Sequence, residues 1–167
     1  MRIVYAGTLP PHPGGSAILG NDLLAGLARR GHDVTAIAPI TAAALEHGEP
    51  LASAEFQLMR YRVPSFESSP NHPASDDFRA CERDGVERLL APLLEAGRAD
   101  LVIAGRETFA SHIPALARRF AVSCIVLAQG GTTWGLLSGA YPRDLERRLL
   151  DGRRALLHRV QCLGGTR

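Results

Sequence analysis

The chain has 167 residues, of which 46% are hydrophobic and 5% aromatic, and its formal net charge is +2. This length and composition fit one α/β domain with a single core, and so small a charge gives no support to nucleic-acid binding. All 19 cationic side chains are arginines, which excludes a Walker A phosphate loop and Schiff-base chemistry within this chain, because both need a lysine.

Apolar runs predict six strands, at Arg2–Ala6, Asp33–Ala38, Glu55–Val63, Asp100–Ala104, Ser123–Ala128 and Arg159–Leu163. Helical periodicity predicts four helices, at about Ser16–Arg30, Asp76–Ala96, Thr108–Phe120 and Pro142–His158. Because strands and helices alternate and most strands are continuously apolar, we expect a doubly wound, mostly parallel, Rossmann-like α/β sheet with strand order 3-2-1-4-5-6.

The first predicted helix has signals at both ends and along one face. Ser16 is expected to cap its first turn, and Gly31 to end it in a left-handed conformation. Leu19, Leu23 and Leu27 recur every four residues, with Leu24 and Ala28 alongside, and this stripe is predicted to face the sheet.

The loop before this helix, PPHPGG, is rigid and carries few side chains that could obstruct a ligand. Gly14 and Gly15 lack Cβ atoms, so a ligand can approach their amides, and the helix beginning at Ser16 directs its positive end to the same place. A phosphate or a sugar hydroxyl is the expected ligand. For the glycine pair taken alone, a tight strand-to-helix turn without a ligand explains the residues equally well.

Further candidates follow the fourth and fifth predicted strands, beside the point where the strand order reverses. Arg106 could hold an anionic group and Glu107 a sugar hydroxyl, although the two could also form an ion pair at a helix start. After the fifth strand come four residues that could bind a sugar or form a plain turn: Gln129, Gly130, Gly131 and Thr132.

Several motifs are absent. No two glycines are separated by one residue, so the GxGxxG dinucleotide fingerprint is missing, and there is no GxSxG elbow. The six histidines are at least 15 residues apart, so we expect no metal site. The three cysteines show no CxxC spacing, and no signal peptide or membrane-spanning run is visible, which together predict a cytoplasmic protein.

The run PPHPGGSAILGNDLLAGLARRGHDV, directly after the first strand, resembles the amino terminus of GT-B-fold retaining glycosyltransferases of the family 4, or group 1, type. In that family a P-x-x-G-G loop precedes a helix ending L-A-x-x-G-H-x-V. The later order ADLVIAG, a helix and VSCIVLAQGG is also similar. The resemblance implies that residues 1–167 form the amino-terminal, acceptor-side domain of a two-domain enzyme whose nucleotide-sugar-binding domain is not in this chain, in cis or as a separate chain.

The resemblance also implies a reaction. A sugar passes from a nucleotide-sugar to an acceptor with retention, without an obligatory metal or other cofactor, and the isolated half has little activity. Family members carry a histidine near the position of Gln129, and glutamine cannot shuttle a proton, so Gln129 and Glu107 are the weak candidates for a catalytic role. Glu87 and Glu95 match the family's E-x7-E donor motif in spacing, but their leucine-rich surroundings favour two exposed helix residues.

Two other functions remain open at this stage. Half of a GT-B nucleotide-sugar epimerase or phosphorylase would have the same architecture, and so would a non-enzymatic module that docks a partner protein. The last 26 residues contain seven arginines. We interpret them as a solvated helix face; the alternative is a surface that contacts anionic lipid or another domain.

Overall fold

The computed structural model describes residues 1–12, 14–41, 44, 55–63, 76–106, 109 and 112–127, with the backbone alone at 76–79. The strands of this part of the chain are β1 (Arg2–Ala6), β2 (Asp33–Ile40), β3 (Gln57–Arg62), β4 (Leu101–Ala104) and β5 (Ser123–Val126). Its helices are α1 (Gly15–Arg29), α3 (Asp76–Glu95) and α4 (Ile113–Arg119).

The strands form one parallel sheet with the order β3-β2-β1-β4-β5. This confirms the doubly wound α/β fold and the first five positions of the predicted strand order. The predicted sixth strand, Arg159–Leu163, and the helix Pro142–His158 lie outside the described residues. The winding direction reverses between β1 and β4, which pair from Ile3 with Leu101 to Ala6 with Ala104.

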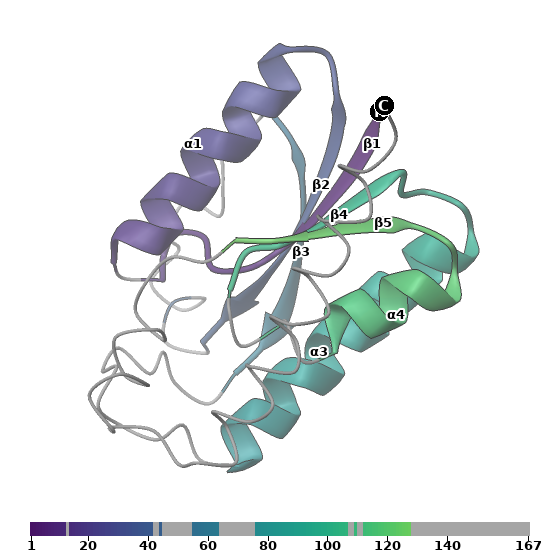
Figure 1. Ribbon diagram of the computed structural model, residues 1–167. Helices are drawn as coiled ribbons and strands as arrows, with labels where there is room; N and C mark the ends of the chain where they lie inside the picture. Colours follow the sequence, from purple (N-terminus) through teal and green to yellow (C-terminus); the bar gives the residue numbers. More distant parts are fainter. Residues whose placement is uncertain are drawn as a thin grey trace, which may run out of the picture.

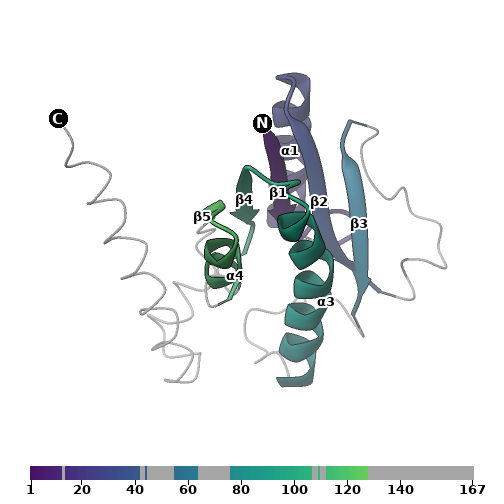
Figure 2. The ribbon, with the colours of Figure 1, turned by 90° about the vertical axis from the view of Figure 1, so that its right-hand side faces the viewer.

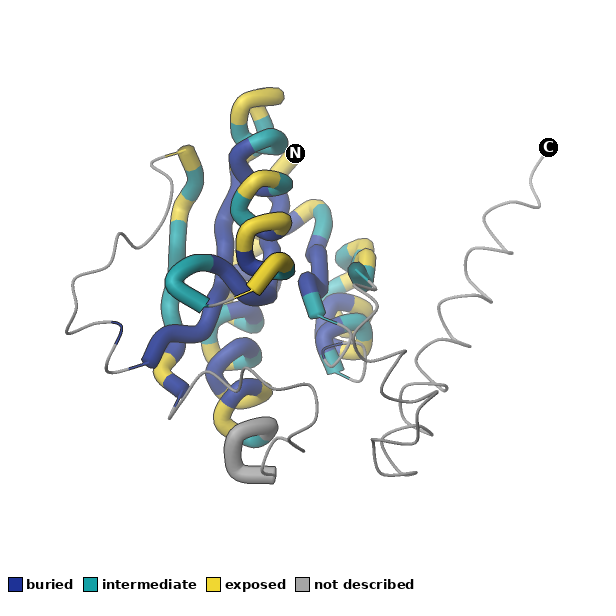
Figure 3. Tube along the Cα trace, turned by 90° about the vertical axis from the view of Figure 1, so that its left-hand side faces the viewer, coloured by how far each residue is buried: buried dark blue, intermediate teal, exposed yellow. Residues whose placement is uncertain are grey.

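Helices cover the sheet on both faces, with α1 on one side and α3 and α4 on the other (Figures 1 and 2). Side chains alternate along β1, so that Ile3 and Tyr5 belong to the core under α1, while Val4 and Ala6 belong to the core under α3 and α4. The central strands are buried along most of their length (Figure 3). Continuous apolar runs in the sequence therefore reflect strands that are covered twice.

The face of α1 that contacts the sheet matches the prediction at Leu24, Leu27 and Ala28, which belong to or pack against the core, but not at Leu19. Its buried residues are Ala17, Gly20, Leu24 and Ala25, whereas Leu19 is 56% exposed. The expected inward position of Leu19 was therefore wrong. The physical reason is that α1 contacts the sheet largely through small residues, and the spacing of leucines in the sequence does not reveal this.

The structure confirms the predicted carboxyl-terminal end of α1 but not the predicted cap at its amino-terminal end. Gly31 has φ 81° and donates to the Ala28 carbonyl (2.8 Å), while His32 donates to the Leu27 carbonyl (3.3 Å). This is the predicted left-handed helix end. At the other end, Gly14 occupies the N-cap position and no side chain caps the helix, so the expected cap at Ser16 was wrong.

Tyr5 limits how closely the loop after β1, the helix α1 and the end of β4 can approach one another. Its side chain is fully buried, and Cβ atoms placed at Gly7, Gly20 or Gly105 would lie 2.4, 2.7 or 2.3 Å from it. These glycines come from the loop after β1, from α1 and from the end of β4. One aromatic ring therefore occupies the space that three missing side chains leave, at the end of the sheet where the strand order reverses.

We predict opposite effects of two alanine substitutions in α1. Gly20→Ala places a Cβ 2.7 Å from the Tyr5 hydroxyl and 3.0 Å from the Thr8 carbonyl oxygen, and overpacking of this kind costs about 1–3 kcal/mol. Gly26→Ala meets no described atom within 4 Å and gains up to about 1 kcal/mol of helix propensity. Urea unfolding measures both changes, and a Gly20→Ala protein as stable as the Gly26→Ala protein would contradict the constraint that we assign to Tyr5.

Candidate functional site

The candidate site lies at the carboxyl ends of the strands, where the loop from β1 enters α1. Gly14 has φ 111° and ψ 163°, a conformation that favours glycine, and both Gly14 and Gly15 are exposed. No described atom lies within 4 Å of a Cβ placed at either glycine. The first amides of a helix have no acceptor within the helix. The backbone at Gly14 and Gly15 is therefore not covered by any described residue, and that it binds a ligand stays a prediction.

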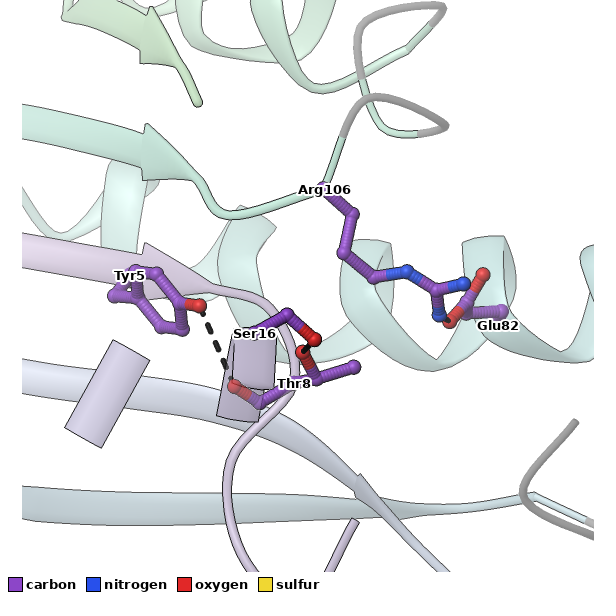
Figure 4. Close-up of polar contacts among 5 residues, drawn as sticks. All are labelled: Tyr5, Thr8, Ser16, Glu82 and Arg106. Atoms are coloured by element: carbon purple, nitrogen blue, oxygen red, sulfur yellow. Dashed lines mark hydrogen bonds and ion pairs between the residues drawn. The ribbon is translucent and has the colours of Figure 1, made fainter. Parts of the chain in front are cut away.

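Two hydrogen bonds close the base of this loop (Figure 4). Thr8 is buried, and its hydroxyl donates to the Ser16 hydroxyl (3.2 Å). The Tyr5 hydroxyl, on the face of the sheet that α1 covers, donates to the Thr8 carbonyl oxygen (3.4 Å). The side chain of Ser16 thus connects the start of α1 to the residues after β1. That Ser16 also binds a ligand stays a prediction.

Arg60 holds the same loop from the other side. It extends from β3, where its side chain is partly buried, and donates to the carbonyl oxygens of Pro10 (2.5 Å) and Pro39 (3.1 Å). Burial lowers the pKa of Arg60 to about 10, so the group stays charged at neutral pH. The sequence analysis missed this residue. Its only signal was that arginines alternate with apolar residues in the run QLMRYR of this strand.

Arg106 directly follows Gly105 at the end of β4 and contacts α3. Its Nη1 donates to Oε1 of Glu82, and its guanidinium carbon lies 5.8 Å from the centre of the Phe109 ring. The Arg106 side chain is 26% exposed and that of Glu82 only 6%. Arg106 therefore forms an ion pair with Glu82, which the sequence did not suggest. The pair with Glu107 that the sequence offered as an alternative stays untested, because Glu107 lies outside the described residues.

The surroundings of this ion pair are aromatic. Tyr61, from β3, is buried, and its hydroxyl has no hydrogen-bond partner among the described residues. Burial raises the pKa of Tyr61, and the charge of Glu82 raises it further. The Phe109 ring packs edge-on against His112 (centroids 5.5 Å apart). The polar groups of Arg106 and Glu82 thus lie beside apolar rings that exclude water from one side of the pair.

The structure brings four of the predicted site residues to one edge of the sheet: Gly14, Gly15, Ser16 and Arg106. Five others lie outside the described residues: Glu107, Gln129, Gly130, Gly131 and Thr132. Glu87 and Glu95 both belong to α3, where Glu95 is exposed, as predicted, while Glu87 is half-buried.

The described part of the chain has neither a metal-binding cluster nor a membrane-spanning helix. It contains no group of three or more His, Cys, Asp or Glu side chains arranged to hold a metal ion. None of its helices combines the length and the apolar character needed to cross a bilayer.

Comparison with known proteins gives the family. A family model described as "Glycosyl transferase 4-like domain" matches residues 14–164. No match to a curated protein sequence is significant. Among solved structures, the chain is similar to Arabidopsis thaliana UGT89C1 complexed with UDP, with 18% identity over 91% of this chain and 40% of that chain and a TM-score of 0.49.

Two further structures are similar over a comparable part of their length. Phytolacca americana UGT2, complexed with UDP-2fluoro-glucose and pterostilbene, shares 14% identity over 74% of this chain and 29% of that chain, with a TM-score of 0.47. The glycotransferase of kitacinnamycin shares 18% identity over 92% of this chain and 38% of that chain, with a TM-score of 0.46. The chain therefore spans 29 to 40% of the length of these structures.

We predict that Arg60→Met loosens the loop between β1 and α1. Methionine keeps an apolar stem but loses both hydrogen bonds to the Pro10 and Pro39 carbonyls, which lowers stability by about 1–3 kcal/mol. Hydrogen exchange of the loop amides should accelerate more than that of the central strands. Arg62→Met, at an exposed position of the same strand, is the control, and equal exchange in the two variants would count against this function of Arg60.

We also predict a pH dependence of stability that comes from His112. Burial, followed by the charge of Arg83, lowers the pKa of His112 to about 4 from an ordinary value of 6.5. The unfolded chain therefore binds more protons than the folded one between these values, and stability falls as pH decreases from 6.5 toward 4. In His112→Gln the fall in Tm between pH 7 and pH 5 should be smaller than in the wild type; the same fall in both proteins would refute the prediction.

Proposed function

We propose that this chain, which belongs to the glycosyl transferase 4-like domain family, is the acceptor-side half of a glycosyltransferase. In the proposed reaction, the bond between a sugar and the diphosphate of a nucleotide-sugar breaks. A bond from the same sugar carbon to an acceptor oxygen forms with retention, and the acceptor loses its proton. Residues 1–167 would form one Rossmann-like domain, and a second domain, in cis or on another chain, would hold most of the nucleotide-sugar. The fraction of the similar structures that the chain spans, 29 to 40%, is consistent with a partial enzyme.

The observation that carries the proposal is the accessible backbone at Gly14 and Gly15. Both are exposed, and no described atom lies within 4 Å of the positions that their Cβ atoms would take. They stand at the amino-terminal end of α1, whose aligned peptide dipoles favour negative charge at this end. Backbone amides whose orientation is fixed before the reaction begins can stabilise the negative charge that develops on a departing diphosphate. The Thr8–Ser16 hydrogen bond and the contacts of Arg60 hold the loop that presents them.

Residues after β4 and β5 complete the proposed site. Arg106 would add N–H donors for an anionic oxygen, since its side chain is partly exposed at the same edge of the sheet. Glu107 would accept a hydrogen bond from a sugar hydroxyl. The residues that follow β5, Gln129, Gly130, Gly131 and Thr132, would contact the transferred sugar, with Gln129 as hydrogen-bond donor and acceptor.

The proposal is tested first by a screen for ligands. The full-length protein is incubated with a panel of nucleotide-sugars and its Tm is measured with each one. We expect stabilisation by one class of donor, because a ligand that binds only the folded protein raises its stability. Hydrolysis or transfer from that donor then identifies the enzyme as a transferase. A panel in which no donor changes the Tm would contradict the proposal.

Gly15→Ala is predicted to separate folding from function. Its Cβ meets no described atom within 4 Å and Gly15 needs no positive φ, so the fold should remain intact. The added methyl group would nevertheless occupy the space through which a ligand reaches the amide. We expect kcat/KM to fall by about tenfold or more, since loss of about 1.4 kcal/mol of transition-state stabilisation has this effect.

Gly26→Ala is the matched control for Gly15→Ala. It introduces the same side chain into the same helix, also without a described atom within 4 Å, but it lies three turns away from the loop. Its kcat/KM should equal that of the wild type. Full turnover in Gly15→Ala would remove the glycine loop from the mechanism.

A further inference from the structure

Glu82 occupies a position where the pattern of α3 would place an apolar side chain. It lies four residues before Val86 and eight before Leu90, and both of these are fully buried in the core. Residues at this spacing share one face of a helix. Glu82 is itself 4% exposed. A carboxylate in such a place is costly unless it is paired, so its presence on the buried face requires an explanation.

The partner of Glu82 comes from a different element. Arg106, after β4, donates from Nη1 to Oε1 of Glu82, and Figure 4 shows the carboxylate facing the end of the guanidinium. The Phe109 ring contacts the same guanidinium at 5.8 Å. Two groups thus fix the orientation of Arg106, which follows β4, the strand that pairs with β1.

The burial of the two partners is unequal. The Arg106 side chain is 26% exposed, whereas that of Glu82 is 6% exposed. Glu82 is therefore too buried to contact a ligand, but Arg106 can. Replacing a buried ion pair by apolar residues is often neutral or stabilising, so stability alone gives little reason for an acid at this position. Orientation of the arginine gives a better one.

We propose that Glu82 is a positioning residue for glycosyl transfer, which holds the Arg106 guanidinium in place to bind the phosphate oxygens of the nucleotide-sugar. This inference rests on the proposed function. A guanidinium that is already oriented loses less side-chain freedom on binding and needs no rearrangement as charge develops on the departing diphosphate. Glu82 acts through Arg106 and does not itself touch the substrate.

The test uses the full-length protein and the nucleotide-sugar that gives the highest turnover. Glu82→Gln keeps the shape of the side chain and removes its charge, and we expect kcat/KM to fall about tenfold. Arg106→Met should lower it at least as much. In the double variant, Glu82→Met with Arg106→Met, the loss should not exceed that of Arg106→Met alone, because Glu82 has no role without its partner. Its Tm should nevertheless return toward that of the wild type, since no charge is left buried and unpaired.

Two further variants separate positioning from folding. Glu95→Gln makes the same change at an exposed position of the same helix, and its kcat/KM should match the wild type. Glu82→Asp keeps the charge on a shorter side chain and should give an intermediate loss, which provides a measurement if Glu82→Gln does not fold.

The possible outcomes distinguish this inference from the function on which it rests. Absence of turnover with every nucleotide-sugar would overturn both. Turnover that falls in Arg106→Met but is unchanged in Glu82→Gln would overturn the role of Glu82 alone. Wild-type kcat/KM in the double variant would show that the ion pair serves only the fold.

Discussion

The packing of Tyr5 against three glycines sets the geometry of the candidate site. Gly7, Gly20 and Gly105 belong to three separate elements, and each would clash with the Tyr5 side chain if it carried a Cβ. The ring therefore fixes the separation of α1 from the sheet and the distance between the ends of β1 and β4. Because the core is close-packed, these elements cannot shift without leaving a gap. The position of the glycine loop follows from this contact.

Polar side chains from the surrounding scaffold then fix the loops at this edge. Arg60, on β3, holds the Pro10 carbonyl; Ser16, on α1, bonds to Thr8; and Glu82, on α3, holds Arg106. In each case a strand or a helix supplies a group that restrains a residue at the carboxyl ends of β1 and β4. A site built in this way presents amides and a guanidinium in fixed orientations, which is the arrangement that stabilisation of a developing charge requires.

The sequence predicted the larger features correctly because they depend on local patterns. Apolar runs and helical periodicity are properties of neighbouring residues, so they located the five described strands and the order of the sheet. The prediction failed where packing decides the outcome. Leu19 fits the leucine period but is exposed, because α1 approaches the sheet through Gly20 and Ala17. Ser16 resembles a cap, but the loop geometry places Gly14 at that position.

The sequence by itself determined the fold class and the resemblance to glycosyltransferases, and it predicted the glycine loop as a place for a ligand. Only the tertiary structure decided which groups support that loop. Arg60 and Pro10 are 50 residues apart, and Glu82 and Arg106 are 24 apart. Nothing in the chain near any of these residues indicates its partner, because the contact exists only once parallel strands and their covering helices have brought distant segments to the same edge of the sheet.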